Sequence, residues 1–268
     1  MDLEGYVARW ALTPDGERRC THSSDLLPVW WEGRPAMLKV ARSVEEERGN
    51  ALMVWLGGVG AARVYRHAGR ALLMERLEGA GSLAALVASG QDDEATRVLC
   101  GAAAGVHRPR PEEPGMLPLR AWFRALAGAA GHGGTFADAW AAAQGLLGDQ
   151  RDVWPLHGDL HHGNVLRSAE RGWLLIDPKG LLGERTFDFA NMLCNPGLED
   201  ALRPGRLERQ AGVIARTAGL EAGRLLAWVG AYAGLSAAWH LEDGQPVQAE
   251  QTLQVAAAAL ALSHRSAK

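Results

Sequence analysis

The sequence contains few cysteines, and their spacing argues against two kinds of stabilising site. Only 3 cysteines occur among 268 residues, at Cys20, Cys100 and Cys194. They lie far apart and form no C-x-x-C pair, so the pattern indicates neither a zinc site nor a disulfide framework. Disulfides are rare where the environment is reducing. We therefore expect a protein of a reducing compartment.

Runs of positive charge and long apolar segments are also missing. The formal net charge is -3, and no run of Lys and Arg forms the basic patch that a nucleic-acid-binding protein usually shows. The longest late apolar run, residues 255–262, is far shorter than a membrane span. The N-terminal sequence MDLEGYVARW lacks the basic region and apolar core of a signal peptide. These absences predict a cytoplasmic protein with no nucleic-acid, membrane or protein partner.

What the sequence does contain is typical of a soluble globular protein. Hydrophobic residues make up 47% and charged residues 22% of a chain that is long enough for two lobes. Strand-like patterns, including residues 6–12, dominate up to about residue 77, and an Ala-, Leu- and Trp-rich helical composition follows. We expect an α+β protein with a small β-rich lobe, residues 1–77, and a larger helical lobe, residues 78–268. An extended linker that contains Pro109, Pro111, Pro114 and Pro118 is expected within the larger lobe. The expected helices of this lobe cover residues 82–89, 92–107, 119–130, 135–147, 206–217, 221–239 and 248–264.

The segment HGDLHHGN carries the strongest chemical signal. His157, Asp159 and Asn164 have the H-x-D-x-x-x-x-N spacing of a phosphotransferase catalytic loop. Phosphoryl transfer requires a carboxylate that orients the attacking hydroxyl and accepts its proton, and oxygen ligands for magnesium. The pattern predicts that Asp159 is the catalytic base and Asn164 a metal ligand, with His157 as a buried structural residue.

The residues after this loop predict a second metal ligand. Two short apolar strands, residues 164–166 and 172–176, flank a polar turn and indicate a hairpin. The second strand ends at Asp177, whose carboxylate is expected to emerge beside Asn164. Magnesium takes oxygen ligands and keeps several waters. We therefore expect Asp177 and Asn164 to hold Mg²⁺.

A metal-dependent hydrolase is the alternative interpretation of the same segment. His157, Asp159, His161 and His162 are residue types that also form catalytic zinc sites. The other histidines of the chain are scattered singly, and no second dense cluster of His and Asp exists in the sequence. This distribution favours the kinase interpretation.

A lysine in the first lobe is the expected partner of nucleotide phosphates. Lys39 lies within the apolar segment PAMLKVA, and a lysine that points inward from a strand needs anionic groups nearby to remain charged. A helix with three consecutive glutamates follows over residues 44–56 and ends at glycine. Among these glutamates we choose Glu46 as the ion-pair partner of Lys39, although acids in a first helical turn also have a simpler explanation in the helix dipole.

The connection between the lobes is expected to bind the adenine ring. Residues 75–81 leave a strand as a polar, glycine-containing segment, and the backbone groups of Glu75 and Leu77 are placed to hydrogen-bond the base. Residues 21–24 occupy the position of a phosphate-covering loop. They lack a glycine-rich signature, so an ordinary Ser/Thr turn is an equally good explanation.

Several segments together resemble the aminoglycoside phosphotransferases, and within them the streptomycin 6-kinases. HGDLHHGN, IDPKG, GERTFDFAN, PAMLKVA and GLSAAW carry the resemblance, which extends from about Trp10 to about Trp239. It implies a two-lobed protein-kinase-like fold that uses ATP and Mg²⁺ to phosphorylate the 6-hydroxyl of streptomycin and so inactivate the antibiotic. It also implies that Asp188 accepts backbone N–H groups of the catalytic loop; a helix N-cap is the simpler alternative. Gly163 departs from related enzymes, which often have glutamate there.

The resemblance further suggests how a cationic substrate is recognised. Streptomycin carries guanidinium groups, which carboxylates bind in a bidentate manner and aromatic rings bind face-on. The candidate substrate residues are Glu199, Asp200, Trp239, Glu242 and Asp243. A kinase of another aminoglycoside or small alcohol would share every catalytic residue, and a nucleotide-binding pseudokinase is a further alternative. The intact set of Lys39, Asp159, Asn164 and Asp177 argues against the pseudokinase.

Overall fold

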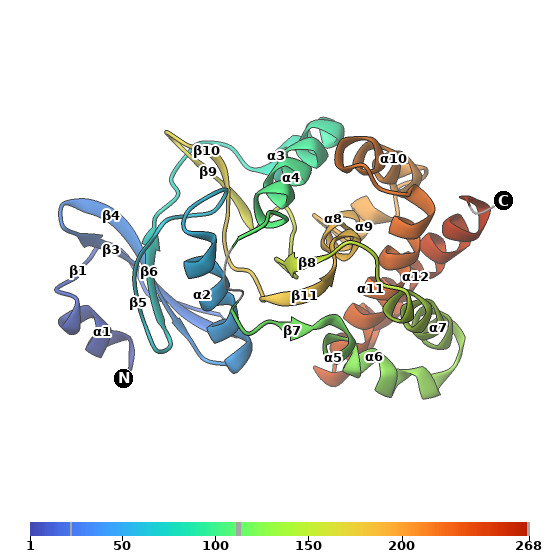
Figure 1. Ribbon diagram of the computed structural model, residues 1–268, viewed down its shortest axis with the longest axis horizontal. Helices are drawn as coiled ribbons and strands as arrows, with labels where there is room; N and C mark the ends of the chain where they lie inside the picture. Colours follow the sequence, from blue (N-terminus) through green and yellow to red (C-terminus); the bar gives the residue numbers. More distant parts are fainter. Residues whose placement is uncertain (22, 111–113, 267–268) are drawn as a thin grey trace.

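The computed structural model describes residues 1–21, 23–110 and 114–266 (Figure 1). His22 and Pro111, which belong to the predicted phosphate-covering loop and the predicted linker, lie outside the described residues. A β-sheet forms one end of the molecule and a group of helices the other, with the N-terminus beside the sheet and the C-terminus beside the helices. Among the described helices, none is both long and apolar enough to cross a membrane.

The N-terminal sheet is antiparallel and has the strand order β1-β3-β4-β6-β5, with β2 paired to β3. Glu32 and Gly33 connect β3 to β4 with φ angles of 49° and 75°, the left-handed conformation that a tight hairpin turn requires. Lys39 lies on β4, at the centre of the sheet. The strands are β1 Thr13–Pro14, β2 Arg19–Cys20, β3 Ser24–Trp31, β4 Arg34–Ala41, β5 Val64–Ala68 and β6 Ala71–Glu75.

The start of the chain is a helix, so the strand expected over residues 6–12 is wrong. Helix α1, Leu3–Arg9, begins at Asp2, whose carboxylate accepts the N–H of Gly5 at 3.0 Å. Leu3, Tyr6 and Trp10 have helical spacing and are buried against the sheet. The Tyr6 hydroxyl donates to the carbonyl of Ala68 at 3.0 Å. The helical period is visible only when Leu3 and the Asp2 cap are included.

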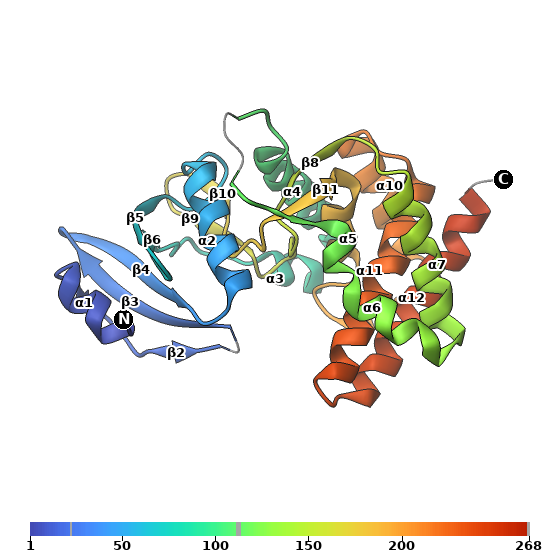
Figure 2. The ribbon, with the colours of Figure 1, turned by 60° about the horizontal axis from the view of Figure 1, so that its bottom comes forward.

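Helix α2, Val44–Leu56, confirms the helix predicted over these residues. Ser43 caps its first turn by accepting the N–H of Glu46 at 3.3 Å, and Gly57 ends it with a φ of 60°. Leu52, Met53 and Leu56 are buried and belong to the same hydrophobic cluster as the core of the helical lobe. The helix therefore lies between the sheet and the second lobe (Figure 2).

The second lobe is mainly helical, which confirms the α+β class and the two-lobed architecture. Helix α11 is its centre: it packs against α7 and α12, and Trp228 in its first half is fully buried. The predicted helix over residues 119–130 is split at Phe123, a buried residue between α5 and α6. The helices are α3 Leu83–Ala88, α4 Asp92–Val106, α5 Leu119–Trp122, α6 Arg124–Ala129, α7 Gly134–Gly148, α8 Ala190–Leu193, α9 Leu198–Ala201, α10 Arg206–Ala218, α11 Ala222–Glu242 and α12 Pro246–Ser266, with 3₁₀ helices η1 Ala130–His132 and η2 Arg185–Phe189.

Short strands between the lobes position the catalytic segment. Strands β9, Val165–Ser168, and β10, Gly172–Leu175, form the predicted hairpin. Strands β8, Val153–Leu156, and β11, Leu181–Glu184, are antiparallel, with Leu156 opposite Leu181, and β7, Leu117–Pro118, pairs with β11. The loop after β8 and the loop before β11 therefore lie at the same end of these strands. Residues 157–164 and 176–180, the two segments predicted to carry the chemistry, lie at that end.

The lobe boundary predicted near residue 77 falls in the connection between β6 and α3. Hydrophobic contacts continue past this connection, because Leu72 and Met74 of β6 belong to the same cluster as the helical lobe. The other face of the sheet has a smaller core of its own beneath α1. The division into residues 1–77 and 78–268 stays a prediction.

Candidate active site

Two amide groups hold the carboxylate of Asp159. The Nδ2 atom of Asn191 donates to Oδ1 at 2.8 Å, and the Nδ2 atom of Asn164 donates to Oδ2 at 3.2 Å. The same Asn164 amide also donates to the backbone carbonyl of Asp159 at 2.9 Å. The carboxylate is therefore oriented by neutral donors and keeps lone pairs for an incoming hydroxyl.

Asp188 fixes the start of the catalytic loop. Its two oxygens accept the backbone N–H groups of His157 and Gly158 at 2.8 and 2.7 Å, and the ring of His107 lies 2.9 Å from Oδ2. These partners lie far from η2 in sequence, so the carboxylate supports the loop instead of capping its own helix. The contacts are those that the resemblance implied.

His157 is fully buried, and its Nε2 atom lies 2.9 Å from the carbonyl of Ile176. Burial lowers the pKa of its imidazole. The residue therefore connects the loop after β8 to the end of β10 and has no access to a substrate. Its placement matches the structural role predicted for it.

The buried carboxylate of Glu46 lies between two lysines. Its Oε2 atom forms an ion pair with Lys39, the predicted partner, and its Oε1 atom lies 2.5 Å from the Nζ atom of Lys179. Lys39 also pairs with Asp177. Burial favours the neutral form of Glu46, but the two ammonium groups outweigh it and hold its pKa below the ordinary value. The sequence interpretation did not include Lys179.

A cavity of about 330 Å³, named here the strand cavity, opens between the sheet and the β9–β10 hairpin. Lys39, Asn164 and Asp177 form its polar end. Glu75 and Leu77, the predicted adenine-binding residues, line its other part. The backbone N–H of Glu75 already donates to the carbonyl of Arg63 at 2.8 Å, so only its carbonyl can serve a ligand. The remaining lining residues are Arg19, Thr21, Ser23, Ser24, Leu26, Met37, Met74, Arg76, Leu166 and Ile176.

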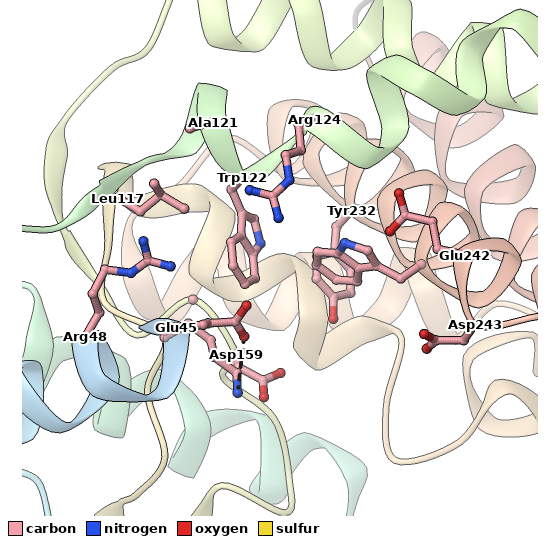
Figure 3. Close-up of a pocket in the computed structure, with 13 residues that line it drawn as sticks. Glu45, Arg48, Leu117, Ala121, Trp122, Arg124, Asp159, Tyr232, Glu242 and Asp243 are labelled. Carbon is pink, nitrogen blue, oxygen red and sulfur yellow. Dashed lines mark ion pairs between the residues drawn. The ribbon is translucent and has the colours of Figure 1, made fainter. Parts of the chain in front are cut away.

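A second cavity, of about 360 Å³ and named here the helix cavity, lies on the other side of the catalytic loop (Figure 3). Asp159 borders it, and both lobes contribute to its wall. Three of the predicted substrate residues, Trp239, Glu242 and Asp243, line it from the end of α11 and the residue after it. The other lining residues are Glu45, Arg48, Leu117, Ala121, Trp122, Arg124, Gly158, Lys179 and Tyr232.

The other two predicted substrate residues, Glu199 and Asp200, are not among the residues that line the helix cavity. They lie on α9, which packs against α10 and α12, and Asp200 forms an ion pair with Arg203. We therefore leave both out of the substrate site. Both were predicted from their charge alone, which does not tell whether a residue faces the cavity.

Aromatic rings form one wall of the helix cavity. The ring of Trp239 lies 5.3 Å from that of Trp122 at an interplanar angle of 72°, and 6.5 Å from that of Tyr232 at 79°. Edge-to-face packing of this kind holds large side chains in defined positions. The aromatic wall lies beside the carboxylates of Glu242 and Asp243, as Figure 3 shows.

The residues present fit a magnesium ion bound together with phosphate groups. The amide nitrogen of Asn164 is engaged by Asp159, which leaves its carbonyl oxygen as a donor atom beside the carboxylate of Asp177. Asp177 has a φ of 58°, a conformation that non-glycine residues seldom adopt and that is often found at functional sites. Within the described ranges no group of three His, Cys, Asp or Glu residues is placed to hold a metal. A hard ion with few protein ligands relies on water and substrate phosphates, as magnesium does.

The sequence did not reveal Asn191 and Asn195, which orient the carboxylate of Asp159. Asn191 is buried, and its Oδ1 atom accepts the Nδ2 group of Asn195 at 2.8 Å. This contact sets the orientation of the Asn191 amide, so its Nδ2 group faces Asp159. The segment GERTFDFAN contained Asn191, but only the fold shows that its side chain reaches a loop 32 residues earlier.

The position of Gly163 also has a local explanation. A Cβ atom at this position would lie 2.9 Å from Cε1 of His161. The backbone N–H of Gly163 donates to Nδ1 of that ring at 3.1 Å. Glycine therefore lets the His161 ring fold over the loop, and a larger residue would require the ring to move.

The chain matches the family model for aminoglycoside/hydroxyurea antibiotic resistance kinases over residues 9–244. It belongs to this family. It is 51% identical over 261 residues to streptomycin 3''-kinase of Klebsiella pneumoniae, covering 95% of this chain and 98% of that one. It is 32% identical over 272 residues to streptomycin 6-kinase of Streptomyces griseus, covering 94% and 86%, and 30% identical over 266 residues to hydroxyurea phosphotransferase of Kitasatospora aureofaciens, covering 94% and 76%. The predicted family is confirmed.

Solved structures of low sequence identity share the fold. An aminoglycoside phosphotransferase in a ternary complex with AMP-PNP and hygromycin B matches with a TM-score of 0.72 at 16% identity and covers 98% of both chains. An ethanolamine kinase of Plasmodium vivax matches with a TM-score of 0.64 at 11% identity, covering 90% of this chain and 81% of that one. The protein-kinase-like fold is thereby confirmed.

Proposed function

We propose that this protein transfers the γ-phosphoryl group of ATP to a hydroxyl of streptomycin and so inactivates the antibiotic. The observation that carries the proposal is the position of Asp159 between the two cavities. Its oriented carboxylate borders the helix cavity and is hydrogen-bonded to Asn164, which lies at the polar end of the strand cavity. The family membership and the streptomycin kinases among the relatives support it. The cytoplasm, where ATP is available, is the proposed location.

In the strand cavity, the proposed ligand is the nucleotide. The carbonyl of Glu75 and the N–H of Leu77 would bind the adenine edge, while apolar residues such as Met37 and Ile176 cover the ring. Lys39 would bind the phosphates, with the segment around Ser24 close by. Glu46 keeps Lys39 in place, because a buried lysine without an anionic partner is costly.

Asn164 and Asp177 would hold magnesium at the polar end of the strand cavity. When bound, this ion supplies positive charge to the phosphate oxygens. Asp159 orients the acceptor hydroxyl and takes its proton as the oxygen attacks phosphorus. The backbone contacts of Asp188 keep the loop rigid, so the distance between the base and the phosphates is set before the substrate arrives.

The helix cavity is the proposed site of the cationic acceptor. Glu242 and Asp243 would bind guanidinium groups, and Trp239 offers a flat surface on which such a group can stack. Glu45 adds a third carboxylate from the opposite lobe. The cavity thus has negative charge on two sides and an aromatic wall between α5 and α11.

The position of phosphorylation is the finer part of the proposal. The resemblance noted in the sequence implied the 6-hydroxyl of streptomycin. Identity is higher with the 3''-kinase, 51%, than with the 6-kinase, 32%, and both alignments cover most of each chain. We therefore propose the 3''-hydroxyl and retain the 6-hydroxyl as the alternative.

One experiment tests reaction, substrate and position. The purified protein is incubated with Mg-ATP and, separately, streptomycin, hygromycin B or hydroxyurea, and the products are analysed by mass spectrometry and phosphorus–proton correlation NMR. We expect one added phosphoryl group on streptomycin alone, at the 3''-oxygen. A phosphorylated 6-oxygen corrects the position. Phosphorylation of hydroxyurea only would reassign the substrate, and no product from any acceptor would favour the pseudokinase.

A further inference from the structure

A second lysine lies on the border between the two cavities. Lys179 lines the helix cavity together with Asp159, whereas Lys39 lines the strand cavity together with Asp177. The two ammonium groups contact different oxygens of the same carboxylate, Glu46. Lys179 also lies 3.6 Å from Oε1 of Glu45. Its side chain is mostly buried, with a relative exposure of 13%.

The backbone of Lys179 is held against both the catalytic loop and α2. Its N–H donates to the carbonyl of His157 at 2.6 Å. A Cβ atom at Gly49 of α2 would lie 1.9 Å from the carbonyl oxygen of Pro178, so only glycine allows this approach. A Cβ atom at Gly180 would lie 3.1 Å from the carbonyl oxygen of Arg48. The lysine is thus fixed relative to Asp159 and to the helix that carries Glu46.

The charges at this border change when ligands bind. Glu46 carries one negative charge and contacts two ammonium groups, while the second partner of Lys39 is Asp177. Asp177 is a proposed magnesium ligand, and an ion bound there would compete with Lys39 for its carboxylate. Glu46 would then remain the shared partner of both lysines, with Glu45 and Asp159 as further carboxylates near Lys179. Lys39 would lose one of its two carboxylate partners, and phosphate oxygens could take that place beside both ammonium groups.

We propose that Lys179 is a catalytic residue that contacts the phosphoryl group as it passes from the nucleotide to the acceptor, while Lys39 binds the phosphates that remain with ADP. The inference rests on the proposed function. The bond between the γ-phosphorus and the β,γ-bridging oxygen breaks, and its electron pair stays on ADP. The bond from the acceptor oxygen to phosphorus forms, and the hydroxyl proton goes to Asp159. Lys179 stabilises the equatorial oxygens, on which negative charge spreads in the transition state.

A purely structural role for Lys179 makes a different prediction. If the lysine only neutralises Glu46 and joins α2 to residues 178–180, its loss should weaken every nucleotide complex to the same degree. If it contacts the transferring group, its loss should weaken only complexes that contain a mimic of that group. The affinities of two complexes therefore distinguish the roles without any measurement of turnover.

The test compares Mg-ADP with Mg-ADP plus aluminium fluoride, which imitates the transferring phosphoryl group, by calorimetry. We expect Lys179→Met to leave the ADP affinity within about 2-fold and to weaken the aluminium fluoride complex by about 100-fold or more, the range for one donor to a developing charge. Lys179→Arg should retain part of this affinity. Lys39→Met should weaken ADP itself. Arg124→Met, which removes another cation from the helix cavity, is the matched control and should change neither affinity.

Two outcomes would overturn the inference: a parallel loss of both affinities in Lys179→Met, which indicates a structural role, or no loss of either. Thermal unfolding of each variant shows whether the fold is retained, and Lys179→Gln replaces the methionine variant if it is not. The binding test needs no acceptor. It therefore reports on Lys179 even if streptomycin is not the substrate, and turnover of the parent protein with streptomycin reports separately on the proposed function.

Discussion

The strand cavity and the helix cavity share a border at the catalytic loop, but they are assembled differently. The strand cavity takes most of its wall from β-strands and from the β6–α3 connection, and its lining mixes apolar side chains with polar and charged ones. The helix cavity takes its wall from α2, α5, α6 and α11, and its lining contains charges of both signs. A nucleotide is the same ligand throughout a kinase fold, whereas an acceptor differs between relatives. We therefore expect the strand side to bind the nucleotide and the helix side to set the acceptor, with Asp159 and Lys179 at the border between them.

The largest effect is expected on the strand side, from Asp177→Ala. This variant should have no detectable activity, because the other carboxylate that lines the strand cavity, Glu75, is paired with Arg171 and cannot replace Asp177. ATP binding should also lose its dependence on magnesium, since the neutral Asn164 is a weak ligand by itself. Calorimetric titration of ATP at several magnesium concentrations checks this. If magnesium still strengthens binding in the variant as in the parent, another carboxylate is the metal ligand.

A large effect is also expected at the border, from Asp159→Asn. Turnover should fall by about 10²- to 10⁴-fold, the usual contribution of a general base, with ATP affinity nearly unchanged. The replacement keeps the size of the side chain, so Asn191 and Asn164 remain packed against it. Steady-state kinetics with both substrates provide the measurement. Near-normal turnover would show that positioning alone accounts for the rate.

An intermediate effect is expected from Asn191→Ala, which removes one donor to the base. A hydrogen bond to a charged group contributes about 1.5 to 3 kcal/mol, so kcat should fall by about 10- to 100-fold while the KM for ATP stays constant. Asn195→Ala, one contact further away, should cause a smaller loss in the same parameter. A change confined to KM in either variant would contradict an orienting role and place Asn191 in binding.

The smallest effect is expected in the helix cavity, from Glu242→Ala and Asp243→Ala. Both residues are exposed, so each should contribute only about 1 kcal/mol to streptomycin binding, close to a fivefold change in affinity. ATP affinity should not change. Calorimetry with each ligand separately, at low and high salt, checks both statements. Glu199→Ala is the matched control outside the cavity, and an equal loss in that variant would remove the distinction between the two acidic pairs.

Local patterns were sufficient where the chemistry depends on neighbours in sequence. The spacing of Asp159 and Asn164 is set by one loop, and the hairpin that presents Asp177 follows directly. Helix α2 was predicted at its observed bounds from its acidic first turn and its terminal glycine, and the structure adds a serine cap at its start. These features depend on backbone geometry over a few residues, which the sequence specifies by itself.

Local patterns failed where packing across the chain decides the outcome. Residues 6–12 alternate enough to suggest a strand, but burial of Leu3 and Tyr6 on the sheet stabilises a helix. The acids Glu199 and Asp200 have the right charge for a cationic substrate, but neither lines the helix cavity. Charge and hydrophobicity are properties of residues, whereas their direction depends on the elements they pack against.

The sequence by itself determined the family, and it predicted the loop of Asp159 and Asn164 and the ion pair of Lys39 with Glu46, which the structure contains. Only the tertiary structure decided that Lys179 shares Glu46 with Lys39, because 133 residues separate Lys179 from that carboxylate. Only the tertiary structure decided, too, that Asn191 reaches Asp159. It also decided which acids enter the helix cavity. The physical reason is that each of these contacts forms between segments distant in the chain, which approach only when the core that contains α2, β6 and α11 is packed.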